Sequence, residues 1–173
     1  MSDLPTDAIK ASAHQSDAQG LRPNVGIILL NKYQEVFWAK RCGQLDAWQF
    51  PQGGIDIGET PEQALYRELY EEVGLEKEDV KCLGETQSWF TYRLPKKYLR
   101  LDSLPLCVGQ KQKWFLLELR GSIEKINFNL GKKAEFEDWR WVDYWHPIEH
   151  VIHFKKNVYR KALQEFSPIV FGH

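Results

Sequence analysis

The sequence predicts an α/β fold in which a mixed β-sheet packs between helices, and three observations lead to this prediction. Several short runs rich in apolar and aromatic residues have the length of strands. Two longer segments repeat apolar residues at every fourth position, as amphipathic helices do. The two kinds of segment are interleaved along 173 residues, a length that suits one domain, and the 43% hydrophobic content is ample for a core.

We expect the chain to consist of an N-terminal extension, a folded domain and a C-terminal tail. Residues 1–20 are rich in Ala, Ser, Asp and Gln, and we expect a flexible N-terminal extension there. The folded domain is expected over residues 21–167, with a short C-terminal tail over 168–173. The expected strands are residues 25–30, 35–40, 48–50, 80–85, 88–94, 113–119 and 139–142.

The first helix is expected over residues 61–73, where both ends carry clear signals. Thr60 is a good N-cap, Pro61 falls at the first helical position, and Gln63 completes a capping box. Gly74 follows as the residue that stops the helix. The apolar stripe toward the core consists of Leu65, Leu69 and Val73.

The second helix is expected near the C-terminus, over residues 154–166. Phe154, Val158, Ala162 and Phe166 repeat at four-residue spacing, with basic residues elsewhere around the helix. This helix and the first would cover the sheet.

The first helix carries an unusual group of acidic side chains. Glu71 and Glu72 lie three and four positions after Glu68, so all three carboxylates are surface neighbours. Three negative charges this close repel one another unless a cation lies between them. Carboxylate oxygens are hard ligands that suit Mg²⁺ or Mn²⁺, and Mg²⁺ usually takes substrate phosphate as a further ligand. The alternative is a solvated acidic helix face, which is the usual reading of a charge run. The glycine-rich loop at Gly53 and Gly54, able to approach a ligand closely, favours the metal site.

The spacing of these residues resembles the Nudix box, a glycine-loop-helix motif. Every fixed position is filled, by Gly53, Glu59, Arg67, Glu68, Leu69, Glu71, Glu72, Gly74 and Leu75. The resemblance implies an α/β/α sandwich and hydrolysis of a diphosphate linked to another group. It also implies two or more Mg²⁺ or Mn²⁺ ions held by Glu68, Glu71 and Glu72, with Glu59 and Arg67 orienting these ligands. Either a glutamate or a metal-bound hydroxide would accept the proton of the attacking water.

A narrower resemblance covers nearly the whole folded region. The segments that carry it are residues 22–27, 48–54, 109–115, 135–142 and 154–155. They resemble the bacterial RNA pyrophosphohydrolases, a Nudix subfamily also described as dinucleoside polyphosphate hydrolases. The resemblance implies removal of pyrophosphate, or of phosphate stepwise, from 5′-tri- or diphosphorylated RNA, which leaves a 5′-monophosphate and promotes mRNA decay.

The same resemblance marks substrate-binding positions outside the box. It singles out the cations Arg22, Arg41 and Lys155, since arginine suits bidentate phosphate contacts and stacking on bases. Phe154 offers an aromatic face for a base, and Gly53 and Gly54 offer backbone close to the phosphates. A single exposed cation is as often merely solvated.

A fourth carboxylate is expected from the loop before Trp139. The resemblance implies that Glu135 helps to hold a further metal ion, with Glu137 and Asp138 as close competitors.

The remaining expectations follow from composition. A net charge of −1 argues against a protein that coats nucleic acid by bulk charge. Three cysteines without metal-ligand spacing indicate reduced, mostly buried thiols, and no secretory signal or bilayer-spanning run is visible, so a cytoplasmic location without membrane association is expected. A monomer is the simple expectation.

Two rival functions stay open. One is a hydrolase of diadenosine polyphosphates or other small nucleotides; the other is a binding protein that keeps the fold without catalysis.

Overall fold

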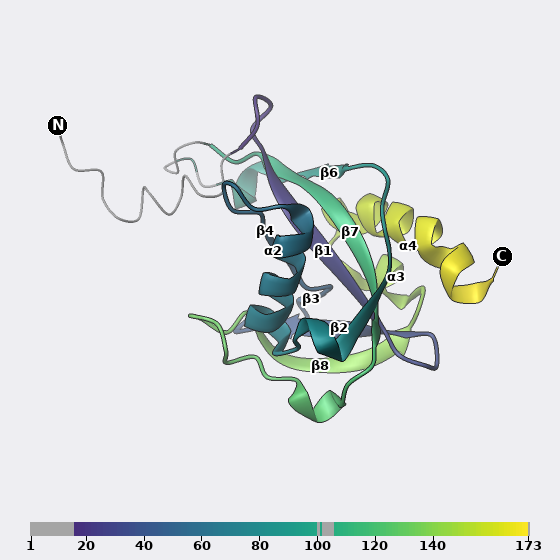
Figure 1. Ribbon diagram of the computed structural model, residues 1–173. Coiled ribbons are helices and arrows are strands. Elements are labelled where there is room, and N and C mark those ends of the chain that lie inside the picture. Colours follow the sequence, from purple (N-terminus) through teal and green to yellow (C-terminus); the bar gives the residue numbers. More distant parts are fainter. Residues whose placement is uncertain (1–15, 100, 102–105, 173) are drawn as a thin grey trace.

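The computed structural model describes residues 16–99, 101 and 106–172, so residues 1–15 of the expected N-terminal extension lie outside the described residues (Figure 1). Its centre is a mixed sheet of eight strands. The strands are β1 (Leu21–Leu30), β2 (Glu35–Arg41), β3 (Trp48–Gln49), β4 (Gln52–Gly54), β5 (Val80–Glu85), β6 (Phe90–Arg93), β7 (Gly109–Leu119) and β8 (Phe136–Asp143).

Strand β1 is the centre of the sheet. It pairs in parallel with β7 along its whole length, from Leu21 opposite Gly109 to Leu30 opposite Glu118. On its other edge, β1 pairs antiparallel with β4 at its first half and with β2 at its end. The main path runs β3-β2-β1-β7-β5, with β8 beside β2 and β6 beside β7. The loop that leads into β4 is thereby placed next to the most buried strand.

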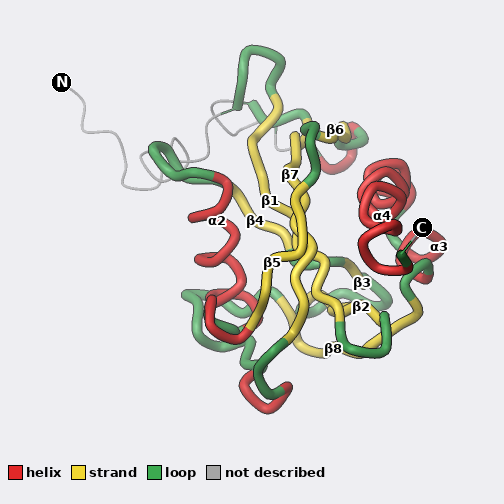
Figure 2. The backbone as a smooth tube through the Cα atoms, turned by 45° about the vertical axis from the view of Figure 1, so that its right-hand side comes forward, coloured by secondary structure: helices red, strands yellow, loops and turns green. Residues whose placement is uncertain are grey.

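Helices cover both faces of this sheet (Figure 2). Helix α2 (Pro61–Glu68) lies on one face, and helices α3 (His146–His150) and α4 (Lys156–Phe171) lie on the other. Because side chains of a strand alternate between faces, β1 supplies Val25, Ile27 and Leu29 to the core under α2, and Ile28 and Leu30 to the core under α4. The predicted α/β sandwich with a mixed sheet between helices is confirmed.

The first helix begins as predicted and ends differently. Thr60 caps it, with the capping-box hydrogen bonds to Gln63 both present, and the predicted apolar stripe is fully buried. The α-helix stops at Glu68, however, and Leu69–Val73 form a π-helical turn before Gly74 ends the segment at φ 85°. Turns of this kind are often found at functional sites, and this one carries two of the predicted metal ligands.

The C-terminal helix runs over Lys156–Phe171, not 154–166. A 3₁₀ turn over His153–Lys155 precedes it, which removes Phe154 from the helix. The far end continues through Pro168 and most of the expected tail, because the ring of Phe171 packs against Tyr144 and Trp145.

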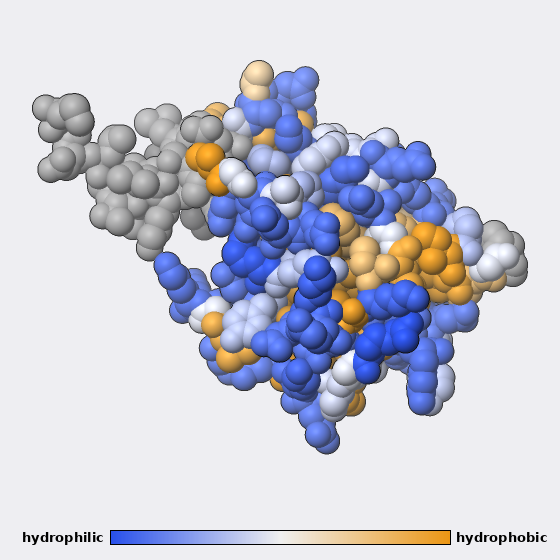
Figure 3. All heavy atoms as spheres, viewed as in Figure 1, coloured by the Kyte–Doolittle hydropathy of each residue, from blue (hydrophilic) through white to orange (hydrophobic). Residues whose placement is uncertain are grey.

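The surface differs from the prediction at the cysteines. Cys42 follows β2 in a turn and Cys82 lies on the edge strand β5; both are exposed, contrary to the expected burial. Hydrophilic side chains cover most of the face in Figure 3, with a hydrophobic area over the region of α4. Among the described helices, none combines the length and apolar character that crossing a bilayer requires.

One buried hydrogen bond joins helix α4 to the chain segment between β3 and β4. The Tyr159 hydroxyl accepts a hydrogen bond of 3.0 Å from the Phe50 backbone N–H, and both side chains are fully buried. Tyr159→Phe leaves that N–H without a partner, so we expect the free energy of unfolding to fall by about 1–3 kcal/mol. Chemical denaturation measures this loss, and Tyr33→Phe, at a hydroxyl-bearing ring that is largely exposed, is the control. Equal stability of the two variants would contradict the assignment.

Candidate active site

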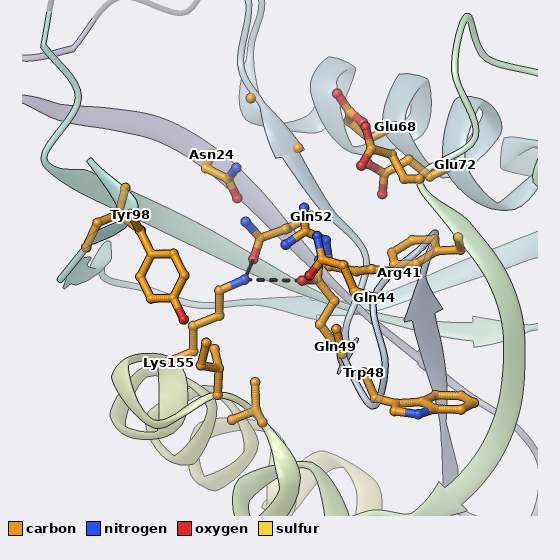
Figure 4. Close-up of a pocket in the computed structure, with 18 of the residues that line it drawn as sticks. Asn24, Arg41, Gln44, Trp48, Gln49, Gln52, Glu68, Glu72, Tyr98 and Lys155 are labelled. Carbon is orange, nitrogen blue, oxygen red and sulfur yellow. Dashed lines mark hydrogen bonds between the residues drawn. The ribbon is translucent and has the colours of Figure 1, made fainter. Parts of the chain in front are cut away.

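An open cleft of about 1300 Å³ extends from the helical segment that carries Glu68, Glu71 and Glu72, here called the box helix, to residues on the other face of the sheet. Its walls come from the first half of β1, strand β4, the box helix, the loop over residues 44–48, and the segments near Tyr98, Glu135 and Lys155. Figure 4 places Glu68 and Glu72 on one side of this cleft and Tyr98 and Lys155 on the other. Segments far apart in the sequence thus share one cavity.

Arg67 is the centre of the hydrogen bonds that organise the acidic side. Its guanidinium makes two bonds of 2.8 Å to the carboxylate of Glu59 and donates to the carbonyl of Gly54 at 2.8 Å. It also donates to Glu68 at 2.7 Å and to Glu71 at 3.3 Å. Glu59 and Arg67, which were expected to orient the metal ligands, are therefore bound to each other, and the pKa of Arg67 is raised, chiefly by its hydrogen bonds to Glu59.

Glu68 is a buried carboxylate pressed against the glycine loop. Its side chain lies so close to Gly53 that a Cβ at that position would overlap the carboxylate, which explains why glycine is required there. Burial raises the pKa of Glu68 to about 7, and the charge of Glu71 adds to this, while Arg67 opposes it.

Glu72 is still more enclosed. Its Oε2 atom is buried and has no hydrogen-bond partner among the described residues. Burial raises the pKa of Glu72 well above the usual range, and the charges of Glu68 and Glu135 raise it further. An ionised carboxylate in this position calls for a cation that the described side chains do not supply to it.

The loop residue Glu135 lies in the same cleft, whereas its competitors are engaged elsewhere. Glu137 accepts hydrogen bonds from Lys40 at 2.8 Å and from the Gly43 backbone at 2.7 Å. Asp138 accepts one from the Trp139 backbone.

The carboxylates line one cleft, but they do not surround a single metal-binding position. Among the described residues, no three acidic, histidine or cysteine side chains are close enough together to hold one ion as they stand. Arg67 occupies one oxygen of Glu68 and one of Glu71.

Lys155 is the main cation of the opposite side. Only 7% of it is exposed, and its ammonium donates to the side-chain oxygens of Gln49 and Gln52, each at 3.3 Å. Burial lowers the pKa of Lys155 to about 8, and the charge of Arg41, which also lines the cleft, lowers it further. Two of the predicted phosphate-binding cations are thus brought together.

Phe154 lies beside Lys155 in a small aromatic group. Its ring centroid is 5.7 Å from that of Tyr92 and 5.5 Å from that of Tyr98. Tyr98 is 43% exposed and forms part of the cleft wall, so a second ring that was not predicted lies beside Phe154. The neighbouring lysines over residues 96–97 were its only local signal.

Other predicted positions have different surroundings. Arg22 lies on the same face of β1 as Asn24, two residues earlier, but it does not line the cleft. Gly54 directs its carbonyl to Arg67 rather than outward. Cations and amides that line the cleft but were not singled out from the sequence are Asn24, Gln44, Gln49, Gln52, Lys97, Lys132 and Lys133.

Comparisons with known proteins agree with this geometry. The NUDIX domain family profile matches residues 20–166. The RNA pyrophosphohydrolase of Shewanella denitrificans is 59% identical over 152 residues, which cover 88% of each chain. That of Aliivibrio salmonicida is 58% identical over 153 residues, covering 88% of this chain and 89% of the relative.

Solved structures share the fold at low identity. The E. coli dihydroneopterin triphosphate pyrophosphohydrolase superposes with a TM-score of 0.67 at 22% identity, over 83% of this chain and 93% of that chain. A C. elegans Ap4A hydrolase binary complex gives 0.59 at 19% identity, over 87% of this chain and 99% of that chain. With the filled box, the profile and the close relatives in agreement, the chain belongs to the NUDIX family of hydrolases.

Proposed function

We propose that this protein hydrolyses the 5′-polyphosphate end of RNA, releasing pyrophosphate or stepwise phosphate and leaving a 5′-monophosphate that promotes mRNA decay. One observation carries the proposal: a single cleft combines buried carboxylates with Lys155, Arg41 and two aromatic rings. Carboxylates suit the metals that accompany phosphates, and rings suit unstacked bases. The printed names of the close relatives support the same substrate.

The carboxylates of the cleft fit divalent ions, which Nudix hydrolases generally use. The orphaned Oε2 of Glu72 and the raised pKa values of Glu68 and Glu72 are what buried ligands show without their cation. Glu68, Glu71, Glu72 and Glu135 would hold two or more Mg²⁺ or Mn²⁺ ions. Such ions supply positive charge against the phosphate oxygens when bound.

The remaining steps belong to the side chains. Arg67 and Glu59 hold the box carboxylates in orientation, through the hydrogen bonds that tie the loop to the helix. A carboxylate of the box accepts the proton of the attacking water. On the opposite side, Lys155 and Arg41 balance the charge of the flanking phosphates, and Phe154 and Tyr98 stack on a base.

Replacing the most buried carboxylate tests the box directly. Glu72→Gln keeps the shape of the side chain and removes its charge, so we expect kcat/KM to fall by about 100-fold or more. The matched control is Glu62→Gln, at an exposed position of α2, which leads into the π-helical turn of Glu72; this variant should keep wild-type turnover. Wild-type turnover of Glu72→Gln at saturating Mg²⁺ would remove Glu72 from the site.

The raised carboxyl pKa values predict a pH-dependent effect of metal on stability. Because the pKa of Glu72 is raised in the folded chain, the folded state keeps this proton after the unfolded chain has lost it, so Glu72 lowers stability as pH rises from 4.5 through the neutral range. We therefore measure both proteins without metal and subtract the Tm of Glu72→Gln from that of wild type. We expect this difference to decrease as pH rises over this window. Mg²⁺ should raise the wild-type Tm more than the variant's at pH 7.5. A pH-independent difference, or equal Mg²⁺ shifts, would contradict the metal site.

The substrate is tested with a short RNA that carries a labelled 5′ γ-phosphate. We expect wild type to release labelled pyrophosphate or phosphate in Mg²⁺ and to leave 5′-monophosphorylated RNA. Diadenosine tetraphosphate is measured in parallel, because the same carboxylates and rings would accept it. Fast cleavage of the dinucleotide without any release from RNA would overturn the RNA function in favour of a small-nucleotide hydrolase.

A further inference from the structure

A buried asparagine lies in the floor of the cleft, between its two sides. Asn24 is 4% exposed and stands on β1, opposite Gly54 of β4 on one edge and opposite Gln112 of β7 on the other. It lines the cleft, and Figure 4 shows its nitrogen on the side of Glu68 and its oxygen on the side of Lys155.

The direction of the Asn24 amide follows from a count of donors that starts at Lys155. An ammonium group has donors only, so the Gln52 atom 3.3 Å from Lys155 Nζ is its oxygen, Oε1. The other end of the Gln52 amide, Nε2, then donates to the Tyr92 hydroxyl at 3.2 Å. Lys155 thereby fixes the orientation of Gln52.

Gln112 passes this orientation on to Asn24. Its side chain is fully buried and lies 3.3 Å from Gln52 Oε1, so the atom that faces this oxygen is the donor Nε2. The same Nε2 donates to Asn24 at 2.9 Å, which requires that atom of Asn24 to be its oxygen. The Asn24 nitrogen is left to point away from the network.

This nitrogen has no acceptor within the protein. Among the described residues, none accepts a hydrogen bond from Asn24 Nδ2, although the residue is buried and belongs to the cleft wall. An N–H donor that lines the cleft without a protein acceptor is available to an acceptor atom of a bound ligand. A neutral donor at this place could bind an anionic oxygen without adding positive charge beside cations held by the neighbouring carboxylates.

We propose that the Asn24 amide binds a non-bridging oxygen of the substrate polyphosphate, and that Gln112 is the positioning residue that aims it. The inference rests on the proposed function only in requiring a polyphosphate substrate. If Gln112 were lost, the Asn24 amide could turn over and present its oxygen to the phosphate, which repels it.

A double-mutant cycle tests both roles. Asn24→Leu and Gln112→Met keep approximate shape and remove the donors, and each should raise KM for 5′-triphosphorylated RNA by about 10-fold or more with little change in kcat. Because Gln112 acts through Asn24, the double variant should lie closer to Asn24→Leu than to the product of the two single effects.

The matched control is Thr86→Val. Thr86 is fully buried and accepts a hydrogen bond from the Trp114 backbone at 3.1 Å, two residues along β7 from Gln112. It should lower Tm as the other variants do and keep the wild-type KM.

Calorimetric binding of inorganic tripolyphosphate separates this inference from the proposed function. Wild-type affinity in Asn24→Leu, or fully multiplicative KM effects in the cycle, would overturn the inference even if the enzyme hydrolyses RNA. Weakened tripolyphosphate binding in both single variants would support it even if diadenosine tetraphosphate proved to be the substrate.

Discussion

The site depends on one guanidinium. Four carboxylates, those of Asp56, Glu59, Glu68 and Glu71, lie within 3.6 Å of Arg67, and without a cation they would repel one another. The flat fork of an arginine can serve Glu59 with two parallel hydrogen bonds while its remaining N–H groups reach the helix, which a lysine ammonium cannot do. The glycine loop and the helix are therefore held as one unit, which sets the positions of the box carboxylates, whereas Glu135 comes from the loop before β8.

What the sequence predicted correctly is mostly local. The cap at Thr60, the stripe at Leu65 and Leu69, and the stop at Gly74 involve residues within a few positions of one another, and all are confirmed. The π-helical turn was missed because a four-residue apolar spacing suits both helix types, and the choice depends on packing against the sheet. The C-terminal helix was placed too short because the contacts that hold Phe171 come from Tyr144 and Trp145, outside the repeat.

The amide network was beyond sequence reasoning for a different reason. Asn24, Gln52 and Gln112 are ordinary polar residues within or beside strands, and nothing in their spacing joins them. Only the strand register places them together, since β1 has β4 on one edge and β7 on the other. Lys155 reaches the same network from a turn before α4. Arg22, in contrast, lies on the same strand and the same face as Asn24, two residues earlier, and does not line the cleft.

The parallel pairing of β1 with β7 also sets the order of events during synthesis. The first strand has its main partner some 88 residues later, so it cannot complete its hydrogen bonds until β7 has left the ribosome. The box helix depends on contacts between residues close in the sequence, so it can form early. At that stage the residues that line the other side of the cleft have not been made. The wall of the cleft that contains Phe154 and Lys155 is therefore made late, and a nascent chain that already carries the whole box still lacks that wall.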